Sequence, residues 1–206
     1  IAIQEPGSGY NLTIGTSTLY AQAATQISGA SPAFVSVNIN NSIVAFDAGS
    51  SANFSSLIAA GTVTMNAPSL TVGSLVVVGS MTLTAGSLTL GANPLEIRTG
   101  GLLALAAAYM SNCNLIVRSG AAFKQVNTLP LNFASIEVDS GGTLMHASNA
   151  AERTAVLNLN VSGNFNLQHG ASIIADGSGY SGRIGNQSGA GAGGGGTGGS
   201  RHGGGG

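Results

Sequence analysis

Apolar side chains recur along the chain in two columns with a period of about twenty residues. Within each column the spacing is constant over the first five members, and the last two spacings are longer by one and by three positions. A nearly fixed period of this size is typical of a solenoid, in which each repeat stacks on its neighbours and buries a continuous core. The first column comprises Val37, Leu57, Val77, Ile97, Val117, Val138 and Val161, and the second, six positions later, comprises Ile43, Val63, Leu83, Leu103, Phe123, Leu144 and Leu167.

Short stretches of alternating apolar and polar residues predict β-strands around these columns. Residues 95–103 show the pattern clearly, because one alternating stretch ends and another begins at Gly100 and Gly101. Glycine suits such a corner, since it adopts positive φ without strain. We therefore predict an all-β fold, a right-handed parallel β-helix of about seven coils, each one period long. A third column predicts a three-sided coil and comprises Leu70, Leu90, Met110 and Leu131.

Changes in the repeat predict three regions. Residues 1–30 lack the period and are expected to form an irregular N-terminal arm or capping turn, and residues 31–176 the β-solenoid. Within the solenoid, residues 149–154 coincide with the longest spacing and are predicted to form a loop at one corner. Residues 177–206 are rich in glycine, and we expect an extended, polyproline II-like tail packed against neighbours.

The chain carries few charges, and they are distributed unevenly. Only 6% of its residues are charged, where about 25% is usual. Glu5 and Asp47 are the only charged residues before Pro94. The net charge of -1 and the single lysine, Lys124, argue against nucleic acid as a partner. No apolar stretch is long enough for a transmembrane segment, and the lone Cys113 allows no intramolecular disulfide.

Most of the charge within the repeats forms one cluster beside the first column. The positions predict a ladder of opposite charges on the outer surface of adjacent coils. The alternative is the catalytic groove of a polysaccharide lyase or hydrolase, which needs clustered carboxylates. His169 and Gly170 match a pair found in pectin-cleaving hydrolases, but the aspartates and basic motif expected around that pair are missing. We therefore predict no enzymatic activity, no catalytic or metal-binding residue and no cofactor. The ladder comprises Glu96, Arg98, Arg118, Glu137 and Asp139.

Five Asn-X-Ser/Thr sequons mark candidate N-glycosylation sites. Chance alone accounts for most of this number in a chain so rich in asparagine, serine and threonine. Three of the five nevertheless fall before residue 95, where charge is nearly absent and attached sugars would supply solubility. The candidate residues are Asn11, Asn40, Asn53, Asn160 and Asn186.

A weakly charged β-solenoid that leads into a Gly-Ser-Gly-Tyr and polyglycine segment resembles large secreted or surface-displayed β-helix proteins of bacteria and protists, including adhesin stalks. The resemblance covers most of the chain and rests on architecture and composition. It implies an extracellular or cell-surface structural protein that assembles with copies of itself through its solenoid ends, uncharged faces and polyglycine tail. The alternative is an adhesin fibre segment whose partners are cell-surface glycans or a receptor.

Overall fold

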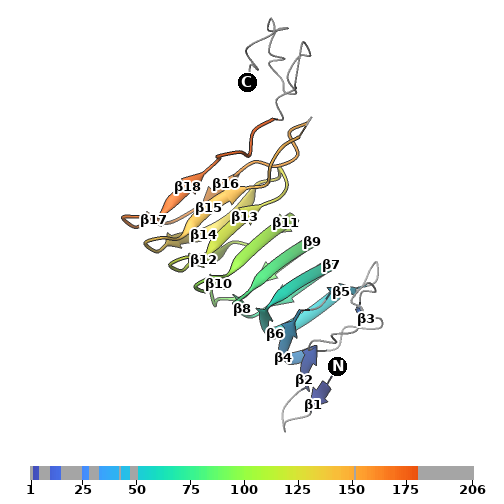
Figure 1. Cartoon of the computed structure of the whole chain (residues 1–206). Helices are drawn as coiled ribbons and strands as arrows, with labels where there is room; N and C mark the ends of the chain where they lie inside the picture. Colours follow the sequence, from blue (N-terminus) through green and yellow to red (C-terminus); the bar gives the residue numbers. More distant parts are fainter. Residues whose placement is uncertain are drawn as a thin grey trace, which may run out of the picture.

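The computed structural model describes residues 2–4, 10–14, 25–27, 33–41, 43–46, 51–150 and 152–180 of the chain. These residues form an all-β parallel solenoid in which the strands stack from β1 at one end to β18 at the other (Figure 1). The predicted fold class is therefore confirmed. Most of the predicted glycine-rich tail lies outside the described residues. The strands are β1 (Ala2–Gln4), β2 (Tyr10–Ile14), β3 (Thr25–Ile27), β4 (Ala33–Asn40), β5 (Ile43–Phe46), β6 (Ser51–Ala60), β7 (Thr62–Val72), β8 (Leu75–Val77), β9 (Ser80–Leu90), β10 (Leu95–Ile97), β11 (Leu102–Met110), β12 (Cys113–Val117), β13 (Ala122–Gln125), β14 (Leu131–Val138), β15 (Thr143–His146), β16 (Leu159–Val161), β17 (Phe165–Leu167) and β18 (Ser172–Ile174).

Strand pairing divides the coil into three faces. The first face runs through β4, β6, β8, β10, β12, β14 and β17, and the second through β5, β7, β9, β11, β13, β15 and β18. The long strands β7 and β9 continue from the second face onto a third, where β6 also pairs with the end of β7. All of these pairings are parallel. Among the described strands, only β1 pairs antiparallel, with β2.

The solenoid has about five turns that lie about 20 residues apart, so the predicted number of seven is wrong. The step between stacked residues varies along the chain. Leu57 pairs with Leu75, a step two positions shorter than the predicted period, whereas Met81 pairs with Leu103, a step two positions longer. The last step is much longer, because Leu131 pairs with Leu159 across a whole loop. The step between turns is therefore uneven, and a constant period does not describe the stacking.

The two predicted columns are correct over part of their length. Val37 pairs with Leu57, Val77 with Ile97, and the later members as far as Val138 and Leu144 stack as expected. The other assignments are wrong because of the uneven steps. Leu57 pairs with Leu75 instead of Val77, Val63 with Met81 instead of Leu83, Leu83 with Leu105 instead of Leu103, Ile43 with Thr64 instead of Val63, Val138 with Leu167 instead of Val161, and Leu144 with Ile173 instead of Leu167. In the third column, Leu70 and Met110 both pair with Leu88 instead of Leu90.

Most predicted core residues are nevertheless buried, including Leu57, Val77 and Leu83. The short and the long step each differ from the predicted period by two positions. Since side chains alternate between the two faces of a strand, an even shift leaves the same residues pointing inward. The interior is filled by aliphatic side chains and by Phe123 and Phe133, whose rings meet edge to face with centroids 6.0 Å apart.

One corner of the coil is a stack of tight turns centred on glycine. The amide of Gly101 donates to the carbonyl of Arg98 (2.7 Å), and Gly100 between them has φ of +78°. Positive φ at this position is what a type II turn requires. Equivalent turns follow in the next three coils, with Gly120, Gly141 and Gly170 at the same position. The predicted glycine corner is confirmed.

Another corner carries the longest insertion. Residues 147–150 and 152–158 contain no strand, in agreement with the predicted loop. Asn149 is buried and holds the loop closed, because its Oδ1 accepts from the amides of Thr154 (2.7 Å) and Ala155 (2.9 Å). Its Nδ2 donates to the carbonyl of Ser178 (3.2 Å), which ties the loop to the last turn.

Candidate functional site

The charged cluster predicted beside the first column forms a connected ladder on the outer surface of β10, β12 and β14. Arg118 Nε donates to Glu96 Oε1 (2.8 Å), and Arg98 Nε donates to Glu96 Oε2 (3.2 Å). In the following coil, Arg118 Nη1 lies 3.4 Å from Asp139 Oδ2. Gln168 extends the chain of contacts, since its Nε2 donates to Asp139 (3.0 Å) and Glu137 (3.3 Å).

The electrostatics of this ladder favour ionised carboxylates. The hydrogen bond from Arg118 holds the pKa of Glu96 below its usual value, although partial burial opposes the shift. A general acid for glycoside cleavage needs the opposite change, a carboxyl group whose pKa is raised. Glu96 is therefore suited to binding arginine and poorly suited to donating a proton, and the ladder acts as a link between adjacent coils.

The last described turn leaves apolar column residues uncovered. Phe165, Leu167 and Ile173 are 43%, 39% and 53% exposed. Their pairing partners in the preceding turn, Ile136, Val138 and Leu144, are at most 1% exposed. The three strands of this turn pair with β14 and β15 on one side, and no described strand pairs with their other edge. We call this surface the terminal face, defined by Phe165, Leu167 and Ile173.

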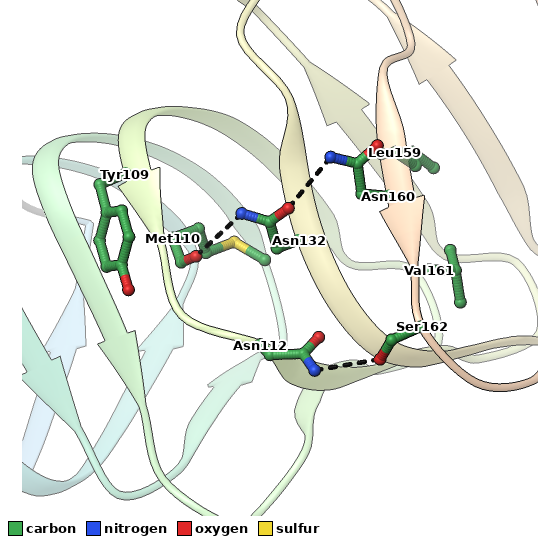
Figure 2. Close-up of a pocket in the computed structure, with 8 residues that line it drawn as sticks. All are labelled: Tyr109, Met110, Asn112, Asn132, Leu159, Asn160, Val161 and Ser162. Carbon is green, nitrogen blue, oxygen red and sulfur yellow. Dashed lines mark hydrogen bonds between the residues drawn. The ribbon is translucent and has the colours of Figure 1, made fainter.

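The third face carries an open groove of about 560 Å³, which we call the amide groove. Tyr109, Asn112, Asn132, Asn160 and Ser162 supply its polar groups, and Figure 2 shows how they line it. Asn112 Nδ2 donates to Ser162 Oγ (3.0 Å), and Asn160 Nδ2 donates to Asn132 Oδ1 (3.1 Å). Asn132 Nδ2 in turn donates to the Met110 carbonyl (3.4 Å).

The local fold explains how Asn112 reaches a residue two turns away. The register between β12 and β14 shifts between Cys113 and Asn114, where Cys113 pairs with Phe133 and Asn114 with Ser135. Ala134 is thus the extra residue of a β-bulge, which bends a strand locally and redirects its side chains. The groove was not predicted from the sequence, although Asn112 and Asn132 lie one period apart, which was a usable signal.

The candidate glycosylation sites occupy different surroundings. Asn40 and Asn160 are exposed, and Asn53 is half-buried. Asn11 lies in β2, and Asn186 falls outside the described residues. Asn160 and Ser162 of one sequon both line the amide groove.

His169 and Cys113 are two further side chains with possible chemical reactivity, and neither lies in a site suited to catalysis. His169 is exposed and occupies the turn that ends at Ala171. Cys113 is buried, and burial raises the pKa of its thiol to about 12, so the thiol is protonated and unreactive at neutral pH. Among the described residues, no group of three or more His, Cys, Asp or Glu side chains could hold a metal ion. The described part of the chain also contains no helix able to cross a membrane.

No protein family matches the chain, and neither a curated protein nor a solved structure shows significant similarity to it.

Proposed function

We propose that the chain is an extracellular structural protein that assembles with copies of itself into a filament, appendage or surface layer. The observation that carries the proposal is the terminal face, where the apolar columns of the core continue to the surface. A second copy that adds a turn to this end would continue both the hydrogen-bonded ladder and the apolar columns.

Burial of the terminal face by another copy would contribute a substantial free energy of association. Full burial of one large aliphatic or aromatic side chain contributes about 1.5–3 kcal/mol. The exposed fractions of Phe165, Leu167 and Ile173 lie near one half. Covering all three would therefore contribute about 2–4 kcal/mol, before new backbone hydrogen bonds are counted.

The scarcity of charge supports the same proposal. Charged side chains of both signs normally keep protein surfaces from associating, and the described strands of the terminal face carry none. The nearest part of the charge ladder, Asp139 and Glu137, is already engaged by Gln168. Little electrostatic repulsion therefore opposes the approach of another copy.

The experiment compares the full-length chain with Ile173→Lys, which places a charge on the terminal face. Val78→Lys is the matched control, because Val78 is 42% exposed and directly follows β8, several turns before the terminal face. We expect concentration-dependent oligomers or filaments for the native chain and the control, and a monomer for Ile173→Lys, by light scattering and negative-stain electron microscopy. A native chain that stays monomeric at high concentration would refute the proposal.

The contribution of the glycine-rich tail is a separate part of the proposal. Deletion of residues 185–206 is expected to weaken side-by-side association while leaving end-to-end contacts in place. Filaments that lose their lateral bundling but keep their length would support this division of roles. Unchanged bundling after the deletion would remove the tail from the proposal.

A further inference from the structure

The amide groove has a chemical character that self-assembly does not use. None of its eight lining residues is charged. Ligands such as phosphates, nucleic acids and uronic acids are bound through arginine or lysine, so the groove offers them no counter-charge. The chemistry of the groove selects a neutral ligand.

The asparagine side chains of the groove are held in place and still have hydrogen-bonding capacity. Each amide has two N–H donors and an oxygen with two lone pairs. Asn112 and Asn160 each use Nδ2 as a donor within the groove, and no described residue donates to the Oδ1 of either. The contacts between Asn112 and Ser162 and between Asn160 and Asn132 restrict these exposed side chains, which lowers the entropy that binding costs.

Tyr109 supplies an aromatic surface beside these amides. This residue is 61% exposed, the largest value among the large apolar and aromatic residues of the described chain. Its cross-strand neighbour is the small Ser87, which leaves the ring uncovered. In Figure 2 the ring flanks the groove opposite the strand that carries Asn160. An exposed tyrosine provides a rigid, amphipathic contact surface at low entropic cost.

We propose that the amide groove binds a neutral oligosaccharide. The Tyr109 ring would stack on the apolar C–H face of one sugar ring, and the amides of Asn112 and Asn160 would donate to and accept from hydroxyl groups. The buried Met110 beside these groups provides an apolar floor. The groove volume of about 560 Å³ lies within the usual range for small-ligand sites. This binding activity goes beyond the proposed structural function and does not depend on assembly.

The test uses the full-length chain from a host that adds no N-glycans, because a glycan on Asn160 would itself occupy the groove. Tetrasaccharides of neutral hexoses and of N-acetylhexosamine are titrated by calorimetry, with tetragalacturonate as the charged probe. Tyrosine fluorescence gives a second readout, since the chain contains no tryptophan. We expect saturable binding of at least one neutral probe with a Kd below about 10 mM and no binding of the charged one.

Variants locate the site. Tyr109→Ala is expected to weaken binding at least tenfold, about 1.4 kcal/mol, whereas Tyr109→Phe keeps the ring and most of the affinity. Asn112→Ala removes the proposed hydrogen bonds to sugar hydroxyl groups and is expected to weaken binding as well. Asn66→Ala is the matched control, an exposed asparagine on the second face that should leave binding unchanged. Unchanged thermal unfolding of the variants separates lost contacts from lost structure.

Two results would overturn the inference. One is the lack of saturable binding to any neutral tetrasaccharide up to about 10 mM. The other is binding that Tyr109→Ala and Asn112→Ala leave intact, which would place the sugar elsewhere on the chain. In either case the amides serve only to link turns of the solenoid.

Discussion

Replacement of Gln125 by leucine separates two explanations of the solenoid interior. Gln125 follows Leu83 and Leu105 in the same inward column, and it is as fully buried as they are. If apolar stacking alone determined stability, Gln125→Leu would continue the leucine column and stabilise the fold. The structure predicts the opposite, because the side chain of Gln125 connects two loops.

The hydrogen bonds of Gln125 set the size of the effect. Its Nε2 donates to the carbonyl of Leu129 (2.6 Å) and to Asn127 Oδ1 (3.2 Å), while its Oε1 accepts from the Asn158 amide (2.7 Å). Leaving the half-buried Asn158 amide and the other partners unsatisfied costs about 1–3 kcal/mol for each group that water cannot reach. The gain from burying leucine offsets about 1 kcal/mol. We expect a net destabilisation of about 2 kcal/mol.

The assay is urea-induced unfolding followed by far-ultraviolet circular dichroism. Gln168→Leu is the matched control, because it also removes three side-chain hydrogen bonds, but from a half-buried surface position where water replaces them. The control should lose less than about 1 kcal/mol. If Gln125→Leu proved as stable as the native chain, or more stable, the role assigned to this polar network would be refuted.

Two further predictions concern the corners and the charge ladder. Gly79→Ala should destabilise the fold by about 3 kcal/mol, because the added Cβ would overlap the backbone of Gly61 in the preceding turn. Gly100→Ala should cost only about 1 kcal/mol, because its φ of +78° is unfavourable for alanine but no atom lies within 4 Å of the added Cβ. Equal unfolding midpoints for the two variants would contradict this prediction. The pKa of Glu96 is lowered in the fold by Arg118, so the stability it contributes is complete above its ordinary value of 4.5 and is lost as the pH falls through the lowered pKa. The native chain should therefore exceed Glu96→Gln in stability at pH 7 and lose that advantage on acidification, and a difference independent of pH would be evidence against the ladder.

The sequence predicted the elements of the fold that depend on local pattern. Alternation in residues 95–103 and the glycines at the corners identified strands and turns, because strand geometry and positive φ impose those patterns directly. The inward positions were also largely predicted, since steps that are two positions shorter or longer than the period preserve the alternation of side chains. The contact between Arg118 and Asp139 could be predicted in the same way, because each residue directly follows a member of the first column, and those two members, Val117 and Val138, pair with each other.

Features that depend on the exact step between turns could not be predicted. The column members beyond Val138 were misassigned because the last step is lengthened by the loop that Asn149 and Gln125 close. The contact between Asn112 and Ser162 joins residues two turns apart and lies beside the register shift at Ala134. Periodicity contains no information about such contacts, so the amide groove emerged only from the structure.

The most direct measurement of the central claim is the reactivity of a thiol placed on the terminal face. In Ile173→Cys the new side chain is the only reactive thiol, because Cys113 is buried and burial raises its pKa to about 12. Assembly through this face predicts that the labelling rate of the cysteine at position 173 falls as protein concentration rises, while a cysteine that replaces Val78, which is 42% exposed and lies several turns earlier, keeps a constant rate. Labelling at position 173 that is equally fast at every concentration would contradict assembly through the end of the solenoid.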